Sequence, residues 1–355
     1  MGWVLPRPPH ARTQRAALKG LQVLRFLVRR LLQAVPTLLI LSILVFSWLR
    51  SLPGGPAAAL LGDKATPEKI ASLNHVLGLD QPVIIQYFKF LGRALTGDFG
   101  SSLVSSQPVM SEIGTFLPAT IELGFSAMVV AVVIGIPAGY LSARYRGGPT
   151  DNVIIVLTLI GVAVPVFFLG YMMQDLLAGP LGLPSQGRQT AGLDATAITN
   201  FAVLDGIMTS EWDAVWDAIR HLILPAFALA TIPLAVITRI TRASVLEVLN
   251  EDFIRTANSK GLTQQVVRRR HVLRNGLLPV VTTIGLQTGA LLGGAVLTER
   301  VFNFRGLGFL LAEGIERRDY PRLQALLLFG ALVYVLVNML VDVSYGIIDP
   351  RVRVR

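Results

Sequence analysis

The sequence contains no cysteine, so disulfide scaffolds, thiolate zinc sites, iron–sulfur clusters and cysteine nucleophiles are all excluded. It also carries little charge: only 15% of its 355 residues are charged, whereas 52% are hydrophobic. The mean hydropathy of +0.59 is too high for a soluble domain of this size. These scarcities indicate a membrane protein and leave the redox compartment open.

Motifs for nucleotide hydrolysis and common hydrolytic chemistry are missing as well. No Gly-Lys dipeptide occurs, so the chain lacks the phosphate-binding loop GxxxxGK[ST] and is not expected to hydrolyse ATP alone. There is no HExxH and no GxSxG, and the four histidines are far apart. We therefore predict a protein that is not an enzyme and has no catalytic residues, no metal site and no cofactor of its own.

Six stretches are long and apolar enough to cross a hydrocarbon layer as a helix, which takes ~20 residues. They cover residues 31–49, 120–143, 153–178, 222–240, 277–298 and 325–348. The first is too long for the apolar part of a signal peptide, and no cleavage pattern follows Arg50, so we expect it to stay uncleaved. The sequence thus predicts an all-α integral membrane protein with six transmembrane helices.

The basic residues predict the orientation, because Lys and Arg are retained on the cytoplasmic side. One set of segments holds 19 Lys or Arg in 82 positions: 1–30, 144–152, 241–276 and 349–355. The other set holds 11 in 134 positions: 50–119, 179–217 and 299–323. We therefore expect both termini in the cytoplasm, and we attribute the net charge of +10 to topology and lipid contact rather than to nucleic acid.

Ionisable residues in the predicted spans are few. Glu122, Asp175 and Arg239 lie close to span boundaries, and Asp342 lies in the cytoplasmic half of the last span. An ion-coupled carrier would pair charges near the middle of the membrane or repeat its halves, and neither pattern is present. The sequence thus shows no energy source of its own, and any energy that the protein uses should come from elsewhere. The alternative functions are an ion-coupled carrier or channel, and a membrane scaffold without a transport role.

The connection 241–276 is patterned like folded helix rather than a simple linker. Asn250 is placed to cap a short helix over Glu251–Lys260, and Gly261 is placed to end it. Thr263 begins a second amphipathic helix with a basic run, which we assign to the positive-inside signal and to anionic lipid.

The first of these helices carries an apolar stripe. Phe253, Ile254 and Ala257 fall on one of its faces. A cytoplasmic helix with such a stripe must bury it, and a groove on a partner would suffice.

The segment NEDFIRTANSKGLTQQVVRRRHVLRNGLLPVVT, beginning at Asn250, resembles the cytoplasmic loop of ATP-binding-cassette importer permeases of the dipeptide/oligopeptide (peptide/nickel) branch, B-type. The general family motif is EAA, three residues, then Gly; its Glu and first Ala are absent here, as expected for the peptide branch. The resemblance implies that this segment is a coupling helix that docks on an ATPase. The coupling residues that it implies are Phe253, Ile254, Arg255, Thr256, Ala257 and Gly261.

Further segments extend the resemblance from about Leu24 to Arg353. They are RRLLQAVPTLLILSILVF, LPGGPA, LGLDQP, GDFGSS, LPATIEL, GGAVLTERVFNFRGLG, RDYP and VDVSYGIIDPRVR. Much of 181–217 has no match, and we expect a variable outer loop there.

The resemblance implies a type I importer permease fold in a bacterial or archaeal plasma membrane. The implied partners are a second homologous permease, two ATPase subunits that bind ATP and Mg²⁺, and an extracytoplasmic solute-binding protein. The implied cargo is di- or oligopeptides, with nickel chelates, glutathione or oligosaccharides as alternatives.

The connection 50–119 also reads as helical. Helices are expected over Pro67–Leu77, ended by Gly78, and over Pro82–Leu95. Such an outer loop either caps the bundle or forms a docking surface for the solute-binding protein, and the resemblance favours docking.

Overall fold

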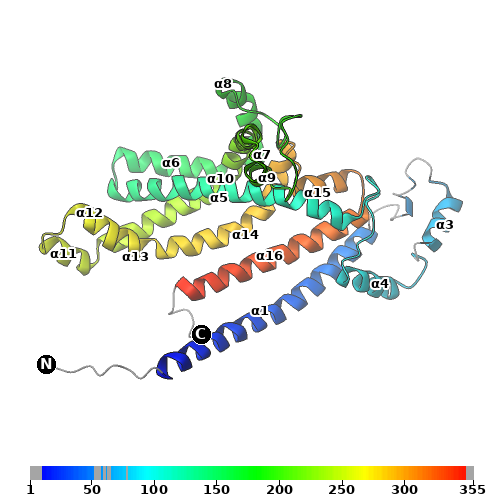
Figure 1. Ribbon diagram of the computed structural model, residues 1–355, viewed down its shortest axis with the longest axis horizontal. Coiled ribbons are helices and arrows are strands. Elements are labelled where there is room, and N and C mark those ends of the chain that lie inside the picture. Colours follow the sequence, from blue (N-terminus) through cyan, green and yellow to red (C-terminus); the bar gives the residue numbers. More distant parts are fainter. Residues whose placement is uncertain (1–9, 52–56, 59–60, 62–64, 77–78, 349–355) are drawn as a thin grey trace.

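The computed structural model describes residues 10–51, 57–58, 61, 65–76 and 79–348, which are mainly helical, with the longest non-helical connection over 182–201 (Figure 1). The longer helices are α1 (His10–Ser51), α3 (Pro67–Val76), α4 (Val83–Leu95), α5 (Val109–Arg144), α6 (Pro149–Ala163), α7 (Val166–Met173), α9 (Ala202–Thr209), α10 (Trp212–Leu249), α11 (Asp252–Ser259), α14 (Leu278–Val301), α15 (Leu307–Glu316) and α16 (Tyr320–Ile348). Short pieces are η2 (Gln174–Ala178), α8 (Gly179–Leu181), α12 (Gln264–Val266), η3 (Val267–Leu273) and α13 (Arg274–Gly276), of which η2 and η3 are π-helical. The predicted tail 349–355, the residues LPGG of the segment LPGGPA, and Gly78 lie outside the described residues.

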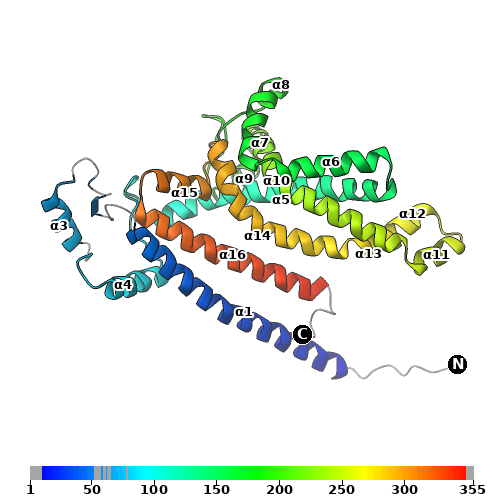
Figure 2. The ribbon, with the colours of Figure 1, turned by 180° about the vertical axis from the view of Figure 1, so that it is seen from behind.

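The helices form an elongated bundle with two different ends. Helices α5, α6, α10 and α14 run side by side, and α1 and α16 form a pair along their flank (Figures 1 and 2). Helices α11 to α13 lie at one end, whereas α3, α4 and α15 lie at the other (Figure 1). The bundle thus places the predicted coupling segment and the predicted outer helices at opposite ends.

Close packing of α5 on α10 forms the centre of the bundle, and small residues make it possible. Ala127 and Ala131 of α5 are fully buried in the main core. A Cβ atom on Gly139 would lie 2.5 Å from the carbonyl oxygen of Thr238, and one on Gly135 would lie 3.1 Å from Ile237. The GxxxG spacing of these two glycines therefore allows the α5 backbone to approach α10 closely.

Four of the described helices are long and apolar enough to cross a membrane, namely α1, α5, α10 and α16. The predicted spans 153–178 and 277–298 are not single straight helices. The first bends by 105° between α6 and α7, and α14 bends by 55° between Leu291 and Gly293. Pro165 explains the first bend, because proline removes a backbone donor and disfavours helical geometry at the preceding residue, Val164, which is extended.

The helices extend beyond the apolar stretches that predicted them. Helix α1 begins at His10, so much of the predicted segment 1–30 is part of the first helix rather than separate from it. Helix α10 continues to Leu249, which takes the first quarter of the predicted connection 241–276 into the helix. Hydropathy marks only the part of a helix that suits lipid, whereas the helix itself continues until a capping signal ends it.

The connection 299–323 is folded rather than open. Glu299 belongs to the last turn of α14, is fully buried, and accepts hydrogen bonds from the Thr120 hydroxyl (2.7 Å) and the Phe309 N–H (2.9 Å). A Cβ on Gly306 would lie 2.5 Å from the Glu299 carboxylate, and one on Gly308 would lie 2.4 Å from the backbone of α14. The RGLG sequence thus lets α15 fold back over α14.

Candidate functional site

The predicted coupling helix is α11, and local signals set its two ends. Glu251, with extended backbone geometry, precedes the helix, whereas Asn250 ends α10 and donates its side-chain amide to the Leu246 carbonyl. Asn250 is therefore not the cap that the sequence predicted, because α10 reaches further than expected. At the other end Gly261 has a φ of +73°, as a glycine that ends a helix should.

Two backbone hydrogen bonds close the C-terminus of α11. The Leu262 N–H donates to the Ala257 carbonyl (3.3 Å), and the Gly261 N–H donates to the Asn258 carbonyl (3.0 Å). This pair of bonds is the Schellman arrangement, which needs a left-handed residue at the position of Gly261. The glycine of the family motif thus has a backbone role.

The apolar stripe of α11 is divided between two surroundings. Ile254 and Ala257 are 4% and 5% exposed and pack with Ala143 of α5 and Val245 of α10. Phe253 is 41% exposed. The expectation that all three share one docking face is wrong, because the chain's own helices already cover two of them.

The outward side of α11 is polar around Phe253. Arg255 is exposed and forms only an ion pair within the helix, 3.6 Å from Asp252. Thr256 is also exposed, and its hydroxyl donates to the Asp252 carbonyl. The six predicted coupling residues therefore fall into two groups: Phe253, Arg255, Thr256 and Gly261 are exposed, and Ile254 and Ala257 are buried.

A buried ionic contact joins α5, α6 and α10 near the base of α11. Arg242 of α10 donates two hydrogen bonds of 2.8 Å to the two carboxylate oxygens of Asp151 in the first turn of α6. Asp151 is 2% exposed and also accepts the Ser142 hydroxyl of α5 and the Gly147 N–H. A bidentate arginine–carboxylate pair fixes both distance and orientation, so the three helix ends are held together.

This contact was not predicted from the sequence. Asp151 and Arg242 are 91 positions apart, and nothing in the chain's local pattern pairs them. The available signal was that Asp151 is the single acid in a short connection predicted to be cytoplasmic and basic.

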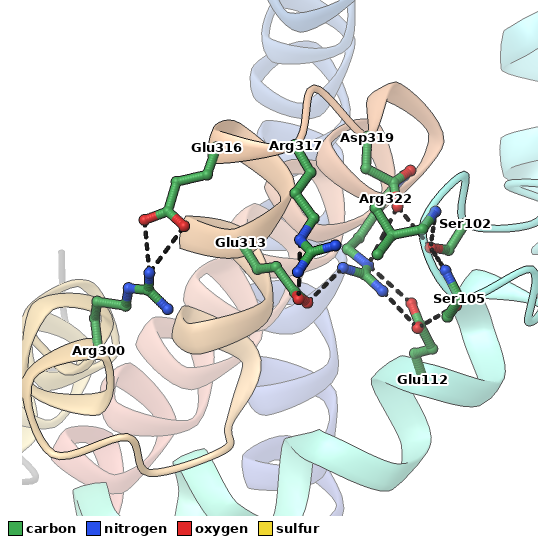
Figure 3. Close-up of polar contacts among 10 residues, drawn as sticks. Ser102, Ser105, Glu112, Arg300, Glu313, Glu316, Arg317, Asp319 and Arg322 are labelled. Carbon is green, nitrogen blue, oxygen red and sulfur yellow. Dashed lines mark hydrogen bonds and ion pairs between the residues drawn. The ribbon is translucent and has the colours of Figure 1, made fainter. Parts of the chain in front are cut away.

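A second ionic cluster occupies the opposite end of the bundle (Figure 3). Arg322, at the start of α16 and 2% exposed, donates to both oxygens of Glu112 in α5 (2.7 and 3.0 Å) and to Glu313 in α15 (2.9 Å). It also lies 3.5 Å from Asp319, which accepts the Ser102 hydroxyl at 2.6 Å. One arginine thus ties two helices and a loop to the first turn of α16.

The ionisable residues noted in the predicted spans have different surroundings. Glu122 is buried, pairs with Arg188 at 2.8 Å and accepts the Val203 N–H, so it holds the connection before α9 against α5. Asp175 and Arg239 are exposed. The side chain of Asp342 lies outside what the structure describes.

Asp205 organises the same connection. It accepts hydrogen bonds from the backbone N–H groups of residues 198–200 and from the Thr199 hydroxyl. Burial acts to raise the pKa of Asp205, but these hydrogen bonds outweigh it and hold the pKa below its usual range. The carboxylate is therefore charged at neutral pH and fixes the loop to α9.

The chain matches two family models. The model described as "Binding-protein-dependent transport system inner membrane component" covers residues 135–354, and the N-terminal model of the same transport-system membrane component covers residues 23–124. The chain therefore belongs to the binding-protein-dependent transport system inner membrane components. It is a multi-pass inner membrane protein and a permease subunit of an ATP-binding-cassette importer.

Curated relatives extend over almost the whole chain. The dipeptide transport system permease protein DppB of Alkalihalophilus pseudofirmus is 44% identical over 332 residues, which is 93% of this chain and 100% of that protein. DppB of Escherichia coli K12 is 43% identical over 336 residues, covering 93% and 99%. The glutathione transport system permease protein GsiC of Escherichia coli K12 is 38% identical over 332 residues, with the same coverage.

A solved structure shares the fold. The MetNI methionine ABC transporter, in an inward-facing conformation, contains a chain that matches with a TM-score of 0.51 and 18% identity. The match covers 69% of this chain and 99% of that one. The fold class predicted from the sequence, an all-α type I importer permease, is confirmed.

Proposed function

We propose that this permease imports di- or oligopeptides. The proposed identity of the cargo rests on the 44% identity, over 93% of the chain, to a protein named as a dipeptide permease. Glutathione, itself a small peptide, is the second candidate cargo, because a relative named for glutathione transport is 38% identical over the same share of the chain.

The chain would form one half of the translocation path beside a second, homologous permease. Two ATPase subunits would bind ATP and Mg²⁺, since this chain has no phosphate-binding loop, and a solute-binding protein would deliver the peptide. Both termini and α11 would face the cytoplasm, as the distribution of Lys and Arg favours.

Helix α11 would dock on an ATPase through its outward side, with Phe253 as the central contact. An exposed aromatic residue on a short polar helix is typical of a binding anchor. Ile254 and Ala257, packed on Ala143 and Val245, would pass the movement of the ATPases to α5 and α10. Closure of the ATPase pair on ATP would then switch the path between the two permeases from inward-facing to outward-facing.

Affinity purification of the tagged chain from gently solubilised native membranes tests the assembly. We expect mass spectrometry to find two ATPase subunits and a second permease with the chain. Recovery of the chain alone, together with uptake that survives ATP depletion, would contradict the proposal and favour an ion-coupled carrier.

Phe253→Ala tests the docking side directly. Loss of a binding anchor costs about 2 kcal/mol, or roughly 30-fold in affinity for the ATPase, while membrane insertion stays normal. Phe227→Ala is the matched control, because Phe227 is equally exposed (40%) but lies in the middle of α10. Equal uptake by the two variants would remove α11 from the coupling role.

A further inference from the structure

A cavity of about 660 Å³ lies at the end of the bundle opposite α11, between α1, α4 and the first turn of α16. Much of its wall is apolar, with Phe46 from α1 and Phe90 from α4. Three cations also line it, Arg50, Lys89 and Arg93, and none of the described lining residues is a carboxylate. The cavity therefore suits a ligand that is both anionic and largely apolar.

Arg50 is held in place but keeps most of its donors. Its Nε and Nη2 both donate to the Gln86 side-chain oxygen (2.9 and 2.5 Å), and its guanidinium carbon lies 3.7 Å from the centre of the Phe46 ring. No carboxylate of the described residues pairs with it within 4.0 Å. Because a guanidinium carries five N–H groups, three remain for an acceptor inside the cavity.

Tyr320 supplies a second unused polar group. It is 3% exposed and lines the same cavity, and its buried hydroxyl has no hydrogen-bond partner in the part of the chain that the structure describes. Buried tyrosine hydroxyls are usually paired, so a ligand oxygen in the cavity would satisfy this one.

The cavity lies where two apolar helices end. Arg50 is in the last turn of the apolar stretch Leu32–Ser51, and Tyr320 is the first residue of the apolar stretch Tyr320–Val341. Arginine and tyrosine at such positions place their polar ends at the level of lipid head groups.

The outer surface beside the cavity is suited to lipid chains. Helix α4 packs on the last turns of α1 through Tyr87, whose hydroxyl is 2.9 Å from Ser42. On its free side Ile84 is 71% exposed and Phe88 is 64% exposed. On α1, Trp48 near the same end of the helix is also exposed (48%).

We propose that the cavity binds an anionic phospholipid. The phosphate is held by the Arg50 guanidinium and the Tyr320 hydroxyl, Lys89 and Arg93 add positive charge at the rim, and the acyl chains run along the exposed faces of α1 and α4. Because the cavity lies at the end opposite α11, the proposed orientation places this lipid in the outer leaflet. That placement rests on the proposed function, whereas the chemistry of the site does not.

Native mass spectrometry of the assembled transporter, titrated with phosphatidylglycerol and with phosphatidylcholine, tests this site. Both lipids carry the phosphate, and they differ in the choline ammonium, which cancels the lipid's negative charge and is repelled by Arg50, Lys89 and Arg93. We therefore expect phosphatidylglycerol to bind about tenfold more tightly, and Arg50→Gln to reduce that preference by removing one of the three cations. Arg305→Gln, which removes an equal charge from the exposed connection before α15, should stay within about twofold of the unmodified chain.

Tyr320→Phe keeps the test valid if Arg50→Gln fails to assemble. It removes only an unpaired hydroxyl, so folding should be unaffected, whereas phosphatidylglycerol should bind about fivefold more weakly. Equal binding of the two lipids, equal losses in Arg50→Gln and Arg305→Gln, or displacement of the lipid by equimolar inorganic phosphate would each overturn the proposal. Displacement by an acidic peptide of a solute-binding protein would overturn it as well.

Discussion

The helices at the two ends of the bundle are attached to it by different forces. At one end α11 contacts α5 and α10 through the apolar side chains of Ile254 and Ala257, and no described α11 side chain donates a hydrogen bond to either helix. At the other end Arg322 joins α16 to α5 and α15 through buried ion pairs. Apolar contacts have no preferred direction, whereas a hydrogen-bonded ion network has one geometry. Helix α11 can therefore shift on the ends of α5 and α10, whereas α15 and the start of α16 stay fixed to α5.

The largest effect should come from Arg322→Met. Removing the arginine leaves the Glu112 and Asp319 carboxylates buried without their counter-charge, which costs about 3–5 kcal/mol of unfolding free energy. Arg300→Met is the control, because its pair with Glu316 is exposed and is worth about 0–1 kcal/mol. Thermal unfolding in detergent measures both, and similar losses would mean that the network does not fix this end.

The second largest effect should come from Gly139→Leu. It should lower the free energy of unfolding by about 1–3 kcal/mol, because the new side chain overpacks against Thr238. Gly124→Leu in the same helix has no atom within 4 Å of the added Cβ and should change unfolding by less than about 0.5 kcal/mol. The same unfolding assay applies, and a neutral Gly139→Leu would show that α5 can move away from α10.

Asp151→Asn should lower the free energy of unfolding by about 2 kcal/mol, since it weakens two hydrogen bonds from the charged Arg242. A double-mutant cycle with Arg242→Gln measures the pairwise energy. A coupling energy near zero would mean that the base of α11 rests on apolar packing alone, which would sharpen the contrast between the ends.

Gly261→Ala should have the smallest effect and lower the free energy of local opening of α11 by about 1 kcal/mol. The φ of +73° at Gly261 disfavours a side chain, although the space around this residue is open. Gly261→Asn should lose less, since asparagine tolerates this geometry better. Hydrogen exchange of α11 amides reports local opening, and equal protection in both variants would remove the backbone explanation for the motif glycine.

Local signals predicted the short helices well. Gly261 ends α11 as expected, and the helix expected from Pro82 is found as α4, because capping and apolar periodicity act within a few residues. The division of the apolar stripe could not be predicted. Periodicity predicts that Phe253 and Ile254 lie near one another on a helix. It does not predict which of them packs against the rest of the chain.

Ion pairs between residues far apart in the chain could not be predicted for a different reason. Arg322 and Glu112 are 210 positions apart, and Arg322 stood in what seemed an outer connection. The bend within the predicted span 153–178 could not be predicted for a third reason, because hydropathy is continuous through Pro165 and does not distinguish a kinked helix from a broken one.

The break at Pro165 has a consequence for the surrounding bilayer. Helix α6 has 15 residues, so at 1.5 Å per residue it is about 22 Å long, short of a hydrocarbon core of ~30 Å. The helical segment that follows, Val166–Leu181, is bent by 105° from α6, so it adds no length along the α6 axis. Along this edge the protein's hydrophobic thickness is smaller than that of an average membrane. The bilayer beside α6 must therefore thin, or a neighbouring protein must cover the edge.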